Sequence, residues 1–269
     1  MSGPVITFLS DYGVQDDFVG VCHGVIAGIC PDARIIDITH GVPRHDVRAG
    51  ALLLRGALPY MPSGVHVAVV DPDVGSPRRA VALALADGRV LVGPDNGLLW
   101  PAVAAHGGAV EAAEITASPY RLPEVAATFH GRDIFAPIAA HLAAGVELSD
   151  AGEPCDPETL VALELPAAER LAGELHVEAL YVDGFGNVQL SASHADLDGL
   201  LRLGHPARLE LESGGSYEAR YVRTFADTRP GELIVYEDAA GALAVAVSHG
   251  SAAERLGLRA QSRLRIAPD

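Results

Sequence analysis

The stretch that decides the fold is Val65-His66-Val67-Ala68-Val69-Val70-Asp71-Pro72-Asp73-Val74-Gly75-Ser76-Pro77-Arg78-Arg79. Its apolar, β-branched run ends at Asp71, and a turn rich in proline, glycine and serine then leads to two arginines. This pattern predicts a buried parallel strand that places Asp71 at the carboxyl edge of a sheet. Ligands of open α/β sheets bind at that edge, although Asp-Pro is also an ordinary start of a turn. Taken alone, the stretch fits a functional and a structural Asp71 equally well.

The charge of the chain narrows the class of partner. Its 269 residues carry 35 acidic and 19 basic side chains, for a net charge of −16, and every basic one is arginine. The absence of lysine excludes a Schiff-base lysine, a Walker-type lysine and a lysine general base. No basic cluster marks a surface for nucleic acid or for an anionic membrane. The sequence therefore predicts a small-molecule substrate, and a cationic or zwitterionic one suits this field best.

The cysteines predict a reducing, cytoplasmic location. Cys22, Cys30 and Cys155 are odd in number and lack CxxC spacing, and the first two lie among apolar residues typical of a core. The chain enters its first expected strand without the charged region of a signal peptide. No uninterrupted apolar stretch is long enough to span a membrane.

Strands and helices alternate over the first part of the chain. The expected strands cover residues 4–9, 34–38, 65–70, 81–86, 89–92 and 110–115, and the expected helices cover residues 18–30, 46–60, 98–106 and 134–144. Asp87-Gly88 lies between two of these strands and predicts a hairpin. The alternation predicts a layered α/β domain with a mostly parallel sheet, which we assign to residues 1–168.

The pattern changes after this region. From residue 174 on, short and often alternating segments cover residues 174–182, 186–191, 207–211, 217–223, 232–236 and 242–248, with turn residues between them. We expect a smaller antiparallel β domain over residues 169–269, built as a barrel or a sandwich. The predicted fold class is thus α/β, with a β-barrel-like domain at the C-terminal end.

Several polar loop residues are candidates for chemistry when they are taken one at a time. Asp11 ends the first strand, where an acid can accept hydrogen bonds from ribose hydroxyls. His130 lies in a loop that opens a helix and could act as acid, base or ligand, whereas most such histidines are simply solvated. His66 sits inside an apolar run, which indicates a packed strand residue. A metal site could draw on Asp11, Asp71, Asp73, Asp95, His40 and His130, but these residues have no recognised ligand spacing.

Several blocks of sequence form a pattern when they are taken together. They are Ser10-Asp11-Tyr12-Gly13 with Asp16-Asp17, Cys30-Pro31-Asp32-Ala33, Val70-Asp71-Pro72 with Gly75, Gly93-Pro94-Asp95-Asn96-Gly97-Leu98-Leu99, Thr128-Phe129-His130-Gly131-Arg132-Asp133, and Phe185-Gly186-Asn187-Val188. In this order, over nearly the whole chain, the blocks resemble the S-adenosylmethionine hydroxide adenosyltransferases. This family, also called the SAM hydrolases, is related to the SAM-dependent fluorinase and chlorinase.

The resemblance implies an architecture and a reaction. The architecture is an N-terminal α/β domain, a C-terminal β domain, and a homotrimer with active sites at subunit interfaces. In the reaction, water attacks C5′ of S-adenosyl-L-methionine as hydroxide, and adenosine and L-methionine are released. The family is linked to a preference for one sulfonium epimer, with the R form as a candidate that the sequence does not decide. Because the sulfonium is an excellent leaving group, we expect no metal, no cofactor and no covalent intermediate.

The resemblance also implies the residues that act. The Asp, Arg and His that prepare the water in this family match Asp71, Arg78 and His130. A carboxylate and an imidazole can orient water and accept its proton, and a guanidinium can fix the carboxylate by a bidentate contact. Arg79 competes for the role of Arg78, which the spacing in the resembling proteins favours. The implied substrate-binding residues are Asp11, Asp16, Asn96, Asp183, Phe185, Asn187, Ser251 and Ala252.

Departures from the relatives bear on the nucleophile. The fluorinase has a tyrosine where this chain has Asp71 and a serine at the halide site where it has Gly131. An anionic Asp71 would repel a halide, so we favour water. Asp238-Ala239-Ala240 stands where relatives often carry a serine that contacts the amino-acid end. The alternatives are a SAM-dependent 5′-halogenase, an adenosine- or SAM-binding module without turnover, and a metal-dependent hydrolase.

Overall fold

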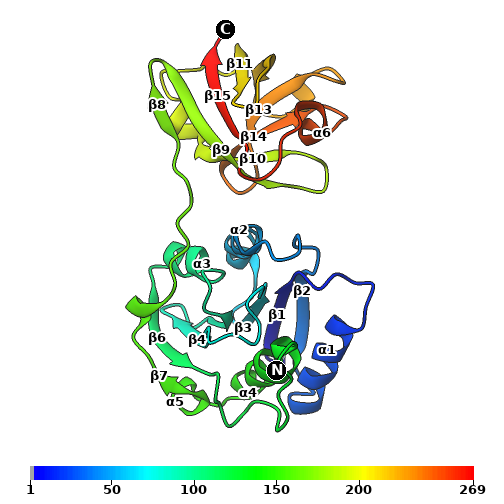
Figure 1. Cartoon of the computed structure of the whole chain (residues 1–269), viewed down its shortest axis with the longest axis vertical. Helices are drawn as coiled ribbons and strands as arrows, with labels where there is room; N and C mark the ends of the chain where they lie inside the picture. The colour runs from blue at the N-terminus through cyan, green and yellow to red at the C-terminus, as the bar shows by residue number, and fades with distance from the viewer. Residues whose placement is uncertain (1–2) are drawn as a thin grey trace. The chain divides into compact units, whose positions relative to one another are not determined.

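The computed structural model describes residues 3–269, which form two compact units. The division falls between Met1–Leu163 and Glu164–Asp269, a few residues before the boundary expected after residue 168. Figure 1 shows the first unit in blue to green and the second in yellow-green to red. Among the described residues, no helix is both long enough and apolar enough to cross a membrane.

The first unit is built on a seven-stranded sheet in the order β2-β1-β3-β5-β4-β6-β7. The strands are β1 (Val5–Ser10), β2 (Arg34–Thr39), β3 (Val65–Val69), β4 (Ala80–Leu85), β5 (Val90–Pro94), β6 (Ala109–Glu114) and β7 (Glu153–Pro154). Strands β2, β1, β3 and β5 pair in parallel, and β4, β6 and β7 extend the sheet in antiparallel pairs. The hairpin expected at Asp87-Gly88 joins β4 to β5.

Helices cover both faces of this sheet. They are α1 (Phe18–Ile29), α2 (Val47–Ala57), α3 (Trp100–Ala105), α4 (Ala136–Ala143) and α5 (Leu148–Ala151), with a 3-10 turn at Leu58–Tyr60 and a π-helical turn at Gly131–Phe135. Ile6, Phe8 and Val67 share one core with the α1 residues Cys22 and Ile26. Alternate strand residues point to opposite faces of the sheet. The helices α2 and α3, which contact each other, lie on the other face.

The focal strand β3 is buried along its whole length. Its parallel neighbours β1 and β5 leave no edge open to water, which explains an almost continuous apolar run. His66 is the polar exception. It is fully buried, and its Nδ1 lies 2.9 Å from the Thr7 hydroxyl of β1, so the expected packed strand residue is confirmed.

We predict that His66 makes the fold sensitive to acid. Burial, with Arg89 nearby, lowers the pKa of His66 from 6.5 to about 4. Between these values the unfolded chain binds a proton that the folded chain excludes, so stability present above pH 6.5 is lost as the pH falls towards 4. The shift corresponds to roughly 3 kcal/mol. Urea unfolding at the two pH values should show a smaller loss in His66→Gln than in the unsubstituted protein, and equal losses would contradict the assignment.

The second unit is a closed β-barrel. Its strands are β8 (Glu169–Leu171), β9 (Glu174–Val182), β10 (Val188–Ser193), β11 (Pro206–Leu211), β12 (Ser216–Tyr221), β13 (Leu233–Glu237), β14 (Ala242–Val247) and β15 (Arg263–Pro268), with the short helix α6 (Ala252–Leu256). The order is β10-β14-β13-β12-β11-β15-β9-β8, and the pairing of β10 with β9 closes the barrel. All pairs are antiparallel except β12 with β13. The predicted fold class is confirmed; β8 and β15 were not expected.

Candidate active site

Asp71, Arg78 and His130 meet at the carboxyl end of β3. The Arg78 guanidinium donates from Nε to Asp71 Oδ1 at 2.8 Å and from Nη2 to Asp71 Oδ2. The same Nη2 donates to His130 Nδ1 at 2.9 Å. The side chains of Asp71 and Arg78 are 5% and 8% exposed, so this is a nearly buried bidentate ion pair, which is a strong and directional contact. The structure thus brings together the three residues that the family resemblance implies.

The turn after β3 places Arg78 against Asp71. The Val74 N–H donates to the Asp71 carbonyl at 3.2 Å, and Gly75 has a φ of +83° with the Ala127 carbonyl directly beside its Cα. A side chain at Gly75 would be strained and would overlap that carbonyl. The Arg78 guanidinium then lies over the Phe135 ring, 5.4 Å from its centroid. This cation–π contact attracts the guanidinium to the ring and fixes the orientation of the guanidinium plane.

His130 is held by the residues that follow it. Asp133 is fully buried and accepts the Ala126 N–H at 2.8 Å and the Arg132 Nε at 2.6 Å. Arg132 also covers the Phe129 ring at 5.1 Å. These contacts anchor both ends of the loop that carries His130 ahead of α4. Arg132 and Asp133 therefore support the loop, and His130 is the residue that this loop places beside Arg78.

The contact with Arg78 fixes the protonation of His130. A guanidinium only donates hydrogen bonds, so Nδ1 accepts, and the proton of the neutral ring is carried by Nε2. Burial lowers the pKa of His130, and the charge of Arg78 lowers it further. A neutral imidazole with Nε2–H available as a donor is the form that this arrangement favours at neutral pH.

A cleft of about 260 Å³ opens beside this cluster. It is lined by Asp11, Tyr12, Phe18, Arg44, His45, Asp71, Val74, Thr128, Phe129, His130 and Gly131. The His45 N–H donates to Asp11 Oδ2 at 2.9 Å, and His45 holds a φ of +65° to do so. Such a backbone conformation is uncommon outside glycine and is found preferentially at functional sites. Asp11 is thus held at the cleft, and its predicted contact with ribose hydroxyls stays a prediction.

Gly131 and Tyr12 share one wall of the cleft. A Cβ built on Gly131 would overlap the Tyr12 hydroxyl and lie 3.0 Å from its Cζ. The Tyr12 ring packs edge-on against Phe8 and Phe129, with centroids 6.3 and 5.7 Å apart. Burial raises the pKa of Tyr12 well above its ordinary value, so the hydroxyl stays protonated. The hydroxyl fills the space that any side chain at position 131 would need.

Two predicted substrate-binding residues lie outside the lining of this cleft. Asp16 is exposed in the loop ahead of α1. Asn96 donates from Nδ2 to the Val70 carbonyl at 2.9 Å and accepts the Leu98 N–H at 3.1 Å. Because Val70 directly precedes Asp71, Asn96 ties the neighbouring turn to the end of β3. The structure gives Asn96 a supporting contact, and its predicted contact with substrate stays a prediction.

The remaining predicted binding residues lie in the second unit. Asp183, Phe185, Asn187 and Ser251 line a cavity of about 900 Å³, together with Phe225, Tyr236, Asp238, Ala239, Ala240, Val247, His249 and Gly250. Phe185 is 83% exposed, and its side chain lines this cavity. Ala252 is fully buried in the barrel core beside this cavity, so only its backbone could contact a ligand.

Hydrogen bonds fix the loop that carries Phe185. Asp183 Oδ1 accepts the N–H groups of Phe185 and Asn187, each at 2.9 Å, and Oδ2 accepts Asn187 Nδ2 at 2.8 Å. Ser251 caps α6 by accepting the Glu254 N–H at 3.1 Å. Gly186 has a φ of +80°, and a Cβ there would lie 2.6 Å from Ser251 Cβ. The loop and the start of α6 are therefore packed as one surface.

Sequence reasoning missed several residues of the first cleft. Tyr12, Phe18 and Phe129 form a cluster of tilted and edge-on rings in its wall, with centroids 5.1–5.8 Å apart. In the sequence such aromatics indicate core, and nothing in the chain predicted that they border a cleft. Arg44 and His45 belong to a loop after β2 whose approach to Asp11 is a long-range contact. The only local feature that could have drawn attention to Arg44 and His45 is their position directly before Asp46, the N-cap of α2.

Comparisons with known proteins agree over both units. Residues 6–152 match the family model of the SAM hydroxide adenosyltransferase N-terminal domain, and residues 177–265 match that of the C-terminal domain. An (R)-S-adenosyl-L-methionine hydrolase of Salinispora tropica is 51% identical over 98% of this chain and 97% of its own length.

A more distant relative and a solved structure also match nearly the whole chain. A fluorinase of Nocardia brasiliensis is 31% identical, over 98% of this chain and 96% of the relative. The crystal structure of an uncharacterized conserved protein from Thermotoga maritima superposes with a TM-score of 0.89 at 34% identity, over 97% of this chain and 99% of that one. With both family models in order along one chain and relatives matched from end to end, this protein belongs to the SAM hydroxide adenosyltransferase family.

Proposed function

We propose that this protein is an enzyme that hydrolyses S-adenosyl-L-methionine at C5′ to adenosine and L-methionine. The observation that carries the proposal is the nearly buried Asp71–Arg78 pair with His130 bound to the same guanidinium, at the edge of a cleft. The family and the names of its relatives support it, because the matched proteins of Salinispora and Thermus thermophilus are named (R)-S-adenosyl-L-methionine hydrolases. We take the R sulfonium epimer as the substrate on the same ground.

The reaction needs an aligned water and an acceptor for one proton. The water oxygen forms a bond to C5′ while the C5′–S bond breaks. The electron pair of the broken C5′–S bond stays on sulfur, which gives the neutral thioether of L-methionine. As the C–O bond forms, the protons of the attacking water become strongly acidic, so even a carboxylate paired with arginine can accept one. Because the leaving group already carries a positive charge, catalysis rests on alignment and electrostatics. We propose that it requires no cofactor.

The hydrogen bonds divide the roles within the cluster. Each oxygen of Asp71 accepts one bond from Arg78, which leaves lone pairs free to accept from water. His130 accepts through Nδ1, so its Nε2–H is the atom that can donate to the water oxygen. We therefore assign proton acceptance to Asp71 and orientation of the water to His130. Arg78 hydrogen-bonds to both side chains and so fixes their positions relative to each other.

Two features favour water over a halide. The anionic carboxylate of Asp71 would repel a halide at the position of the nucleophile, and the Tyr12 hydroxyl occupies the space beside Gly131. The fluorinases are also the less similar relatives, at 31% identity or below against 51% for the Salinispora tropica hydrolase.

Binding of the rest of the substrate follows the family pattern. We propose that Asp11 binds the ribose hydroxyls and that Asp16 and Asn96 also contact the substrate. Asp183, Phe185 and Asn187 would hold the methionine part, and the backbone at Ser251 and Ala252 would meet adenine. The exposed Phe185 and the fixed turn around Asp183 support this assignment.

We further propose a cytoplasmic homotrimer with active sites at subunit interfaces. Light scattering should give about three times the chain mass of 27.9 kDa.

Product analysis tests the function. The protein is incubated with the R and the S epimer of S-adenosyl-L-methionine in ¹⁸O-labelled water, with and without chloride, and the nucleosides are separated and weighed by mass spectrometry. We expect adenosine with ¹⁸O at the 5′ position, mainly from the R epimer. A chlorinated nucleoside as main product would favour the halogenase, and binding without turnover would favour a binding module. Complete loss of turnover on chelation, with recovery on added metal, would favour a metal-dependent hydrolase.

We predict a sharp contrast between the two adjacent arginines. Arg79 contacts neither Asp71 nor His130 but donates to Asp95 and to the Thr159 carbonyl at 2.6 Å. Arg78→Lys keeps the charge and loses the fork, so it should lower kcat/KM by about 100-fold through misplacement of Asp71. Arg79→Lys should leave kcat/KM within a few-fold and instead lower the melting temperature. If the two variants exchanged these effects, the assignment of Arg78 would be wrong.

A further inference from the structure

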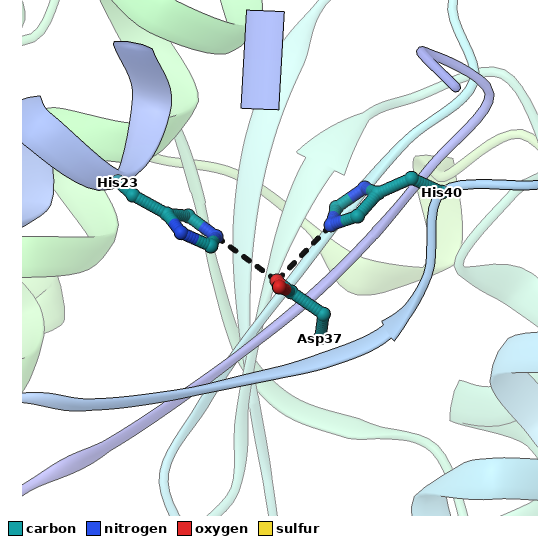
Figure 2. Close-up of side chains that lie close together, drawn as sticks. All are labelled: His23, Asp37 and His40. Atoms are coloured by element: carbon teal, nitrogen blue, oxygen red, sulfur yellow. Dashed lines mark hydrogen bonds and ion pairs between the residues drawn. The ribbon is translucent and has the colours of Figure 1, made fainter. Parts of the chain in front are cut away.

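A second cluster of side chains that could ligate a metal lies near the end of β1. His23 of α1, Asp37 of β2 and His40 after β2 converge on one point, as Figure 2 shows. The Nε2 atoms of His23 and His40 lie 2.9 and 3.0 Å from the same oxygen, Asp37 Oδ1. All three donor atoms fall within 4.8 Å of one another. None of these residues lines the cleft that holds Asp71 and His130.

The geometry of His40 points to a missing partner. Its side chain is 4% exposed, and its Nε2 makes no hydrogen bond although Asp37 Oδ1 is 3.0 Å away. The nitrogen and the oxygen are thus close but not aligned as donor and acceptor. A buried imidazole nitrogen without a partner is costly. His23 Nε2 is in hydrogen-bond contact with Asp37 Oδ1 at 2.9 Å, so His40 Nε2 is the nitrogen of this cluster that lacks a partner.

The other side of the His40 ring is already held as a metal ligand would be. Its Nδ1 lies 2.7 Å from the Ser10 hydroxyl, and Ser10 is fully buried. A ligating histidine usually donates its second ring N–H to an oxygen, which leaves the other nitrogen with a free lone pair. With Ser10 as the acceptor, the lone pair of His40 is on Nε2, toward Asp37 and His23.

We propose that His23, Asp37 and His40 bind a divalent transition-metal ion, with Zn²⁺ as the best fit. Two imidazoles and one carboxylate suit zinc. Bond lengths of about 2.0–2.2 Å require ligand atoms roughly 3–3.5 Å apart, and the two His–Asp distances of 2.9 and 3.0 Å are close to that separation. The side chains of His23 and Asp37 are 31% and 41% exposed, which leaves room for water as a fourth ligand.

The site has a structural role next to the reaction. Ser10 is the last residue of β1, and the residues after it, Asp11 and Tyr12, line the cleft. The His40 carbonyl also accepts the Gly13 N–H at 2.8 Å. An ion bound by His40 would therefore stiffen the segment that carries the ribose-binding acid. This inference goes beyond the proposed hydrolysis, in which no step passes through the metal.

Direct metal binding tests the proposal. The full-length protein, freed of any histidine tag and stripped with chelator, is titrated with Zn²⁺ against a chromophoric competitor. We expect one ion per chain, an affinity at least about tenfold lower in His23→Gln and in Asp37→Asn, and no change in His176→Gln. His176 is the matched control, because it too lies near a carboxylate, 3.8 Å from Glu174, but belongs to no three-ligand group among the described residues. Excess Zn²⁺ should raise the melting temperature of the unsubstituted protein and of the control only.

Two results would overturn the metal site. One is an unsubstituted protein that binds no more Zn²⁺ than His23→Gln, because the cluster would then be a hydrogen-bonded one. The other is binding that His176→Gln weakens as much as the cluster variants do, since the ion would then be held by scattered surface histidines. Both readouts are independent of turnover, so failure of the hydrolase assignment leaves this test intact.

Discussion

Replacing Asp71 with asparagine is expected to lower kcat by about 10²–10⁴-fold, the range of a general base in proton transfer. Asparagine keeps the size of the side chain, but its amide cannot accept the proton of the attacking water. KM should change much less, because no contact of Asp71 with the methionine or adenine parts is proposed. Steady-state kinetics with S-adenosyl-L-methionine measure the two effects separately.

The same substitution has a cost in stability that must be measured beside it. Arg78 is 8% exposed and would lose its only counter-charge among the described contacts. Breaking one partner of a buried ion pair costs roughly 3–5 kcal/mol, so urea unfolding should show a clear shift. Kinetics are therefore taken well below the unfolding temperature of the variant.

Asp73→Asn is the matched control for this experiment. Asp73 lies two residues further along the same turn, and it is exposed. The control loses one carboxylate from the same segment, and both its activity and its stability should stay near those of the unsubstituted protein. Equal loss of kcat and of substrate affinity in Asp71→Asn would refute the role in handling water, and so would an equally inactive Asp73→Asn.

Local patterns predicted most of the fold. The apolar run of β3, the Asp87-Gly88 hairpin and the stripe of α1 each carry their structure in neighbouring residues, so their bounds agree with the structure to within a few positions. The strand β15 was missed although Arg263-Leu264-Arg265-Ile266 alternates as a half-buried strand does. Without β15 the barrel could not be ordered, since it joins β11 to β9.

The candidate site was predictable only through resemblance. Asp71 could be placed at a sheet edge from its strand, but nothing local connects it to His130, which lies on a different element far along the chain. Their meeting depends on Arg78, which bonds to both. The His23–Asp37–His40 cluster shows the same limit, because it joins a helix, a strand and a loop, and only His40 entered a metal hypothesis from the sequence.

Gly131→Ala is expected to damage the cleft through Tyr12. The new Cβ would overlap the Tyr12 hydroxyl, and the ring cannot swing away because Phe8, Phe18 and Phe129 surround it. Overpacking of this kind costs about 1–3 kcal/mol of stability. Because Gly131 follows His130, a displacement of about 1 Å there should also lower kcat/KM by about 100-fold.

Tyr12→Phe provides the decisive comparison. Without the hydroxyl, the nearest ring atom to the new Cβ is Cζ at 3.0 Å, a tight contact that small shifts can relieve. The double variant should therefore be more stable and more active than Gly131→Ala alone, with a coupling energy of about 0.5–3 kcal/mol in a double-mutant cycle. Additive effects would mean that the new Cβ does not act through the Tyr12 hydroxyl. A positive coupling would instead show that the Tyr12 hydroxyl and the missing side chain at 131 together define the wall beside the nucleophile.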